Sequence, residues 1–178
     1  VVGYVHVVAA TFNIQDFTID LNGQWISTNT GNNVNISNNF VNNGSMLGST
    51  GGIFNFNGAD KTMSGSSTTT IFYRANFAGS TTSSITNDVT VLNNLTINNG
   101  CTFTSSSGTV KVGGNWANNG TFVHGSGTVD FNGTGAQTVL TNGSNWSTLK
   151  VSNASAGGVS FTDAFTASHF RCTTPGAN

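Results

Sequence analysis

The sequence repeats itself over a long distance, and this repeat limits the possible folds more than any other feature. Residues 34–58 read VNISNNFVNNGSMLGSTGGIFNFNG, and residues 110–133 read VKVGGNWANNGTFVHGSGTVDFNG. The match extends toward the N-terminus, where residues 17–19 correspond to residues 95–97. Two long repeats of about 76 residues therefore fill most of the chain, and long-range repetition is typical of stacked, solenoid-like architectures.

Each long repeat divides again into units of about 18–20 residues. Within a unit, short alternating runs such as Val110-Lys111-Val112 are separated by Asn, Gly and Ser. Alternation with a period of two predicts strands, and Asn and Gly suit tight corners. We predict an all-β parallel β-helix of about nine rungs over residues 14–178, preceded by an apolar strand at residues 1–13. The alternative is an antiparallel sandwich.

Composition favours an all-β protein outside the cell. Charged residues make up 6% of the chain, against roughly 25% in ordinary soluble domains. Few Glu, Lys or Arg remain to form helices, while 36% hydrophobic residues suffice for a core. A net charge of −1 argues against a nucleic-acid partner, and no apolar run reaches the ~20 residues of a membrane span. We expect an extracellular or cell-surface location, because the surface relies on neutral hydroxyls and amides.

The alternation also predicts which side chains face the core. Asn residues at equivalent corners are expected to stack in hydrogen-bonded amide ladders between rungs. The expected core residues are Ile19, Val34, Ile36, Phe56, Leu92, Leu95, Ile97, Val110, Val112, Phe122, Phe131 and Val151.

The segment GNWANNGTFVHGSGTVDFNGTGAQTV, followed by NWSTLKV, resembles the repeats of large secreted bacterial surface proteins. The rung length is also similar to that of the β-helices in filamentous haemagglutinins and autotransporter passengers. The resemblance covers about residues 14–170. It implies a β-solenoid that serves in adhesion, biofilm scaffolding or display, without pointing to one ligand.

The acidic residues form no catalytic constellation, so we expect neither enzyme activity nor a cofactor. Polysaccharide-cleaving β-helices cluster their acids or bases on one face, whereas the acids here are scattered over different rungs. Asp88 and Asp163, at similar corners four rungs apart, are separated by ~19 Å at a rise of ~4.8 Å per rung. This exceeds the ~5–9.5 Å of a glycosidase pair. The six acids are Asp16, Asp20, Asp60, Asp88, Asp130 and Asp163.

Histidines and cysteines give no sign of a metal site or a disulfide. His6, His124 and His169 are dispersed, which argues against zinc. Cys101 and Cys172 lie about four rungs apart in the predicted register, whereas a disulfide needs Cα atoms within ~7 Å. We expect two buried thiols without an intrachain bond.

Two other binding functions have candidate residues. A carbohydrate-binding module would use Trp25, Trp116 and Trp146 as stacking platforms, but Trp116 and Trp146 correspond to Phe40 and Phe72 in the repeat, which indicates core positions. An ice-binding face would use Thr-rich strands, as at 68–70 and 102–104. Thr pairs do not recur at one rung position, so we consider this function less favoured.

The first twelve residues, VVGYVHVVAATF, are apolar at both odd and even positions. A strand of this kind buries both faces, and one way is to add itself to a neighbouring subunit. The alternative is that the segment folds back over its own first rung as a cap. The predicted subunit contacts are Val1, Val2, Tyr4, Val5, Val7, Val8 and Phe12.

These observations predict a structural subunit of an extracellular filament or fibrous adhesin. Open solenoid ends carry unpaired strand edges, which natural proteins cap or cover. We expect a homopolymer of identical subunits, assembled by end-to-end stacking and strand addition. The alternatives are a fragment of a larger adhesin and a surface module that binds glycans.

Overall fold

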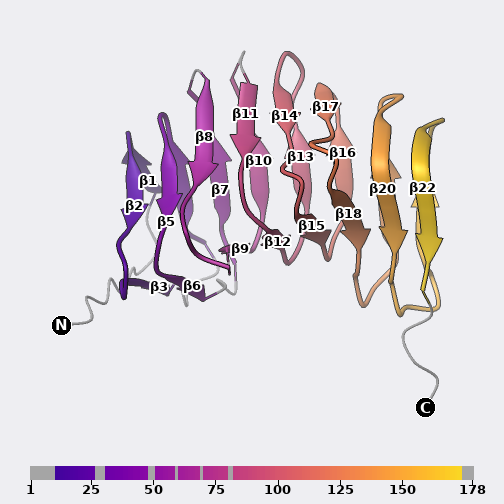
Figure 1. Cartoon of the computed structure of the whole chain (residues 1–178), viewed down its shortest axis with the longest axis horizontal. Helices are drawn as coiled ribbons and strands as arrows, with labels where there is room; N and C mark the ends of the chain where they lie inside the picture. The colour runs from indigo at the N-terminus through magenta and orange to yellow at the C-terminus, as the bar shows by residue number, and fades with distance from the viewer. Residues whose placement is uncertain are drawn as a thin grey trace.

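The computed structural model describes residues 11–26, 31–47, 51–58, 60–68, 70–79 and 82–173. These residues form 22 strands and no helix, wound into a parallel β-solenoid of about seven turns (Figure 1). Every strand pairing among them is parallel. The predicted parallel β-helix is confirmed, and the described part of the chain is not an antiparallel sandwich.

Three sides wind around one core, and each turn visits them in the same order. Side 1 is an eight-stranded sheet of β1 (Thr11–Ile14), β4 (Asn33–Ile36), β7 (Ile53–Phe56), β10 (Ala75–Phe77), β13 (Leu95–Ile97), β16 (Trp116–Asn118), β19 (Gln137–Leu140) and β21 (Val159–Phe161). Side 2 is a six-stranded sheet of β2 (Phe17–Ile19), β5 (Phe40–Asn42), β8 (Lys61–Ser64), β11 (Thr82–Ile85), β14 (Thr102–Thr104) and β17 (Thr121–Val123).

Side 3 begins with a two-stranded sheet, β3 (Gln24–Ile26) and β6 (Ser45–Leu47). It continues as a six-stranded sheet of β9 (Thr70–Phe72), β12 (Val89–Val91), β15 (Thr109–Val112), β18 (Thr128–Phe131), β20 (Asn145–Val151) and β22 (Thr166–Cys172). β6 contacts β9, so the two sheets form one side. β20 and β22 are seven residues long, and only the last four residues of β20 pair with β18.

The turns average roughly 21 residues, so there are about seven of them instead of about nine. The difference comes from how the long repeat is wound. Strands that correspond in the two repeats are eleven strands apart, as in β5 and β16 or β7 and β18. With three strands to a turn, eleven strands make three turns and two further sides. The second copy of each strand therefore lies on a different side from the first.

Most of the predicted core residues are buried. Ten of the twelve are at most 6% exposed, Val151 is half-buried, and Leu92 is 46% exposed. The prediction for Leu92 was wrong because Val89 and Val91 occupy the inward positions of β12, so alternation turns the next residue outward. Aromatic rings in contact run along the core, from Phe17 and Trp25 at one end to Phe161 and Phe165 near the other.

An amide ladder does form, but at a mid-strand position on side 1 and not at a corner. Asn35 donates to Oδ1 of Asn13 at 2.8 Å, Asn55 to Asn35 at 2.8 Å, and Asn76 to Asn55 at 2.9 Å. At the corners, Asn side chains instead accept from backbone N–H groups one turn further on. Asn94 Oδ1 accepts from Asn115 N at 2.9 Å, for example. Both kinds of bond tie neighbouring turns together.

Close approach of turns at the corners also explains the need for glycine. Gly65 has φ 130°, and a Cβ at this position would collide with the backbone carbonyl oxygen of Asn42 in the turn before. Only glycine combines this backbone conformation with so little space.

Candidate functional site

The outer face of side 3 carries one column of charged residues. Lys111, Asp130, Lys150 and Arg171 are successive register partners on β15, β18, β20 and β22. Lys111 and Arg171 are exposed and Lys150 is partly exposed. We call Lys111, Lys150 and Arg171 the basic column, and these three are most of the five basic residues of the chain.

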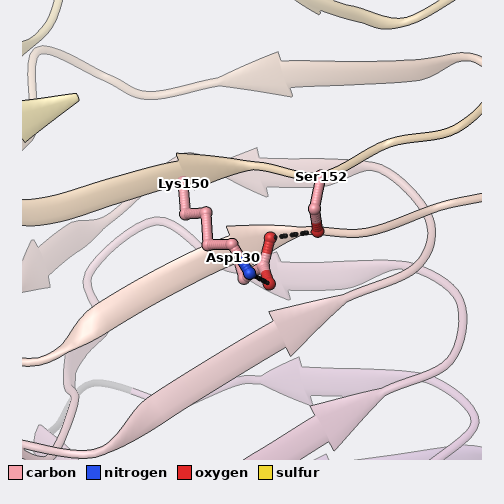
Figure 2. Close-up of polar contacts among 3 residues, drawn as sticks. All are labelled: Asp130, Lys150 and Ser152. Carbon is pink, nitrogen blue, oxygen red and sulfur yellow. Dashed lines mark hydrogen bonds and ion pairs between the residues drawn. The ribbon is translucent and has the colours of Figure 1, made fainter. Parts of the chain in front are cut away.

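Asp130 sits inside the basic column and is held by its neighbours (Figure 2). Lys150 Nζ lies 2.9 Å from Asp130 Oδ2, and the hydroxyl of Ser152 donates to Asp130 Oδ1 at 2.6 Å. The Asp130 residue is only 3% exposed. Both carboxylate oxygens are therefore bonded and covered, so the carboxylate acts as an anchor for Lys150.

A second column on the same face consists of hydroxyl groups. Thr109, Thr128 and Thr148 are successive register partners, followed by His169 on β22. They lie two residues before the charged column on each strand, so both columns point to the same side. Single Thr residues thus do recur at one position, which the sequence pattern did not suggest. The Thr102–Thr104 pair, in contrast, faces Thr121 and Val123 on the next strand of side 2.

The C-terminal end of the described solenoid is an open strand edge with aromatic residues. β22 is the last strand of side 3 and pairs only with β20 among the described strands. It is exposed at every position except Ala167, and Phe170 is 52% exposed. The ring of Phe170 lies 6.3 Å from that of Phe165, which lies 4.6 Å from that of Phe161.

Several Asp side chains cap backbone N–H groups at corners. Asp16 accepts from Asn39 N at 3.1 Å, Asp88 from Thr109 N at 2.7 Å, and Asp163 from Thr141 N at 2.7 Å. Asp88 precedes β12 and Asp163 follows β21, so the two occupy different corners, contrary to the predicted register. These bonds give the three carboxylates a role in holding turns together.

The structure places the histidines and cysteines apart. His124 Nδ1 accepts from Ser126 N at 3.3 Å, and His169 is exposed on β22, while His6 lies outside the described residues. In the described ranges, no three His, Cys, Asp or Glu residues are grouped closely enough to hold a metal ion. Both thiols are free: Cys101 is buried as expected, but Cys172 is exposed because β22 has no described strand beyond it.

The three tryptophans are core residues. Trp25 is 6%, Trp116 1% and Trp146 0% exposed, so none of them can stack on a sugar. Their indole Nε1 atoms are buried and have no hydrogen-bond partner among the described residues. The correspondence of Trp116 and Trp146 with Phe40 and Phe72 in the repeat therefore gave the correct interpretation.

The predicted subunit contacts are only partly visible. Val1, Val2, Tyr4, Val5, Val7 and Val8 lie outside the described residues. Phe12 lies in β1, pairs in register with Val34, and packs partly against the core. β1, from Thr11 to Ile14, thus belongs to the first described turn, and residue 14, where we expected the solenoid to start, is its last residue.

Sequence reasoning missed the basic column, although a signal was present. The tripeptides Thr-Val-Lys at 109–111, Thr-Val-Asp at 128–130, Thr-Leu-Lys at 148–150 and His-Phe-Arg at 169–171 share one pattern. Their spacing is close to one turn, which places them side by side once the turn length is known.

Comparison with protein-family models, with curated proteins and with solved structures found no match for this chain. Among the described residues there is no helix with the length and apolar character needed to span a bilayer.

Proposed function

We propose that this chain is a structural section of an extracellular filament or fibrous surface adhesin, extended by end-to-end stacking of solenoids. The observation that carries the proposal is the open edge of β22, a seven-residue strand with no described partner on its outer side. An unpaired strand edge is a template for another strand. In a parallel solenoid, a strand that pairs with this open edge continues the stacking of the turns.

Apolar side chains at this end support the proposal. Phe161, Phe165 and Phe170 are in ring contact and continue the aromatic residues of the core. Phe170 is more than half exposed. Full burial of an exposed side chain of this kind is worth about 1.5–3 kcal/mol, so covering the exposed half of Phe170 would add about half of that to the strand pairing.

The charge of the chain supports self-association. A net charge of −1 and only 6% charged residues leave little repulsion between identical copies. A surface of hydroxyls and amides also suits a protein outside the cell. The partner we propose is therefore another copy of the chain, or a neighbouring turn of the same adhesin.

The test is assembly of the purified chain, observed by negative-stain electron microscopy and sedimentation. We expect rods much longer than one solenoid, and Phe170→Asn should reduce them to short single rods. Leu92→Asn is the matched control, because Leu92 is similarly exposed but lies in the middle of the solenoid. Single short rods at every wild-type concentration, or equal effects of the two variants, would contradict the proposal.

A second variant tests the N-terminal segment. Deleting residues 1–10 leaves β1 intact, since β1 starts at Thr11. If the segment adds to a neighbouring subunit, the shortened chain should stay folded and polymerise less. More extensive polymerisation would instead identify the segment as a cap.

A further inference from the structure

We propose that the outer face of side 3 binds an extended acidic polysaccharide, a polyuronate, along the basic column of Lys111, Lys150 and Arg171. Most of the site lies away from the strand edge used in the proposed assembly: Lys111 lies on β15 and Lys150 on β20, and only Arg171 lies on β22 itself. The two proposals can therefore fail independently.

The distribution of charge points to an anionic ligand. Of the two basic residues outside the column, Lys61 is 2% exposed, and Arg74 lies with its guanidinium carbon 5.1 Å from the ring centroid of Tyr73. Of the four basic residues that reach the surface, three therefore lie on one face and Arg74 is the fourth, although the net charge of the chain is −1. A local cationic face on a near-neutral protein favours an anion at that place.

Asp130 does not cancel this character. Its carboxylate is bonded to Lys150 and Ser152, as Figure 2 shows, and the residue is buried. Asp130 is therefore covered, whereas the exposed Asp88 lies at one edge of this face, where its carboxylate accepts from Thr109 N and lines a hollow together with Lys111. Lys111, Asp130, Lys150 and Arg171 together carry a net of two positive charges, and Asp88 at the edge of the face reduces this to one.

The geometry favours a polymer over a small molecule. Neighbouring strands are ~4.8 Å apart, so Lys111 and Arg171 are separated by three steps, ~14 Å, along the solenoid axis. A row of this length on a sheet surface matches successive charges of an extended chain. The small net charge of this face is insufficient for the many phosphate contacts of nucleic-acid binding.

The hydroxyl column supplies the second half of the recognition. Thr109, Thr128 and Thr148 run parallel to the bases on the same face. Hydroxyls both donate and accept hydrogen bonds, as the hydroxyls of a sugar do. Arg and Lys bind carboxylates by charge-assisted hydrogen bonds. A sugar polymer with one carboxylate per residue presents both groups in repeating order.

The test is binding of polygalacturonate to the full chain, measured by calorimetry, with dextran and double-stranded DNA as comparison polymers. We expect polygalacturonate to bind, dextran not to bind, and the affinity to fall with added salt. Lys111→Gln should weaken binding about fivefold, the effect of one exposed cation facing an anionic surface. The matched control is Arg74→Gln, which removes a partly exposed positive charge at the corner between β9 and β10, outside the basic column.

Some results would overturn the proposal. The proposal fails if polygalacturonate does not bind, if dextran binds as well as polygalacturonate, or if DNA binds as tightly or more tightly. It also fails if Lys111→Gln and Arg74→Gln weaken binding equally. Phe170→Asn provides the link to assembly: it should leave polygalacturonate affinity unchanged even where it abolishes filaments. Loss of affinity in that variant would mean that binding needs the assembled form and not the basic column of one chain.

Discussion

The side-chain amide of Asn76 donates a hydrogen bond to Oδ1 of Asn55 over 2.9 Å, and the Oδ1 atom of Asn76 is buried with no partner in the described part of the chain. The amide ladder of side 1 ends here because the next residue in register is Thr96. One unsatisfied acceptor therefore marks the end of the ladder. A buried acceptor without a partner costs about 1–3 kcal/mol.

Extending the ladder should stabilise the protein. In Thr96→Asn, the new amide would donate to Asn76 Oδ1, in the direction of the three existing bonds. We expect a gain of about 1 kcal/mol in the free energy of unfolding, measured by urea denaturation. Thr96→Val, which has no donor, is the control. A Thr96→Asn protein no more stable than Thr96→Val would disprove the assignment of the ladder end.

The tryptophans test the equivalence of the two repeats. Trp116 begins β16 and corresponds to Phe40, which begins β5, and both side chains are 1% exposed. Trp116→Phe removes an unpartnered N–H group as well as some volume, so we expect a loss below about 1.5 kcal/mol. Trp116→Ala should cost about 3–5 kcal/mol. Similar losses in the two variants would show that the indole is needed specifically.

Lys61 provides a test in the alkaline range. It begins β8, is 2% exposed, and donates from Nζ to the carbonyl of Gly58. Gln137 begins β19, eleven strands later, and its Nε2 donates to Val112 O at 2.9 Å, so the corresponding position of the second repeat holds a neutral donor. Burial lowers the pKa of Lys61, although Cys101 and Asp60 act to raise it.

Because the pKa of Lys61 is lower in the folded chain, the unfolded chain binds more protons between the two pKa values, and stability rises with pH there. Lys61→Gln keeps a donor without a charge. We expect it to be as stable as wild type at pH 7, or about 1 kcal/mol more stable. As the pH rises toward 10, the midpoint of thermal unfolding of wild type should rise relative to that of Lys61→Gln. A difference between the two proteins that does not change with pH would contradict this account.

Asp163 provides the corresponding test in acid. Partial burial acts to raise the pKa of its carboxyl, but the N–H groups of Thr141 and Gly143, at 2.7 Å and 3.3 Å, hold this pKa below its ordinary value. A lowered carboxyl pKa adds stability above the unfolded value near 3.9, and this stability is lost as the pH falls through the folded value.

Asp163→Asn should therefore be less stable than wild type at neutral pH. Its stability should also fall less than that of wild type between about pH 5 and pH 2. The readout is the midpoint of thermal unfolding across this range. Asp20→Asn is the control, because the exposed Asp20 carboxylate has no hydrogen bond among the described residues. If both variants follow the wild-type acid profile, the N–H groups do not stabilise the charged carboxylate.

Much of the core followed from the sequence alone. Alternation identified Ile36, Ile97, Val112 and Phe131 as buried, because side chains alternate along any strand regardless of its neighbours. It failed for Leu92, because Val89 and Val91 already hold the inward positions of β12. The basic column was not recognised, since no residue in it is close in sequence to the next.

Asn42 and Asn118 show what the sequence by itself determined. Both end a short strand, are almost fully buried, and accept a hydrogen bond from the glycine two residues later. This corner depends on a few neighbouring residues, so the same local sequence produces it in both repeats. The long repeat thus determined the parallel solenoid, the inward and outward positions, and the chemistry of the corners.

Only the tertiary structure decided which of these strands lie on the same side. Asn42 is on side 2 and Asn118 on side 1, although they are equivalent in the repeat. Register partners are about one turn apart, and the length of a turn is the sum of its three strands and its corners. The packing of the core fixes that sum, whereas the repeat length does not. For this reason, the residues of each column, including the basic column, become neighbours only when the length of every turn is fixed in the folded chain.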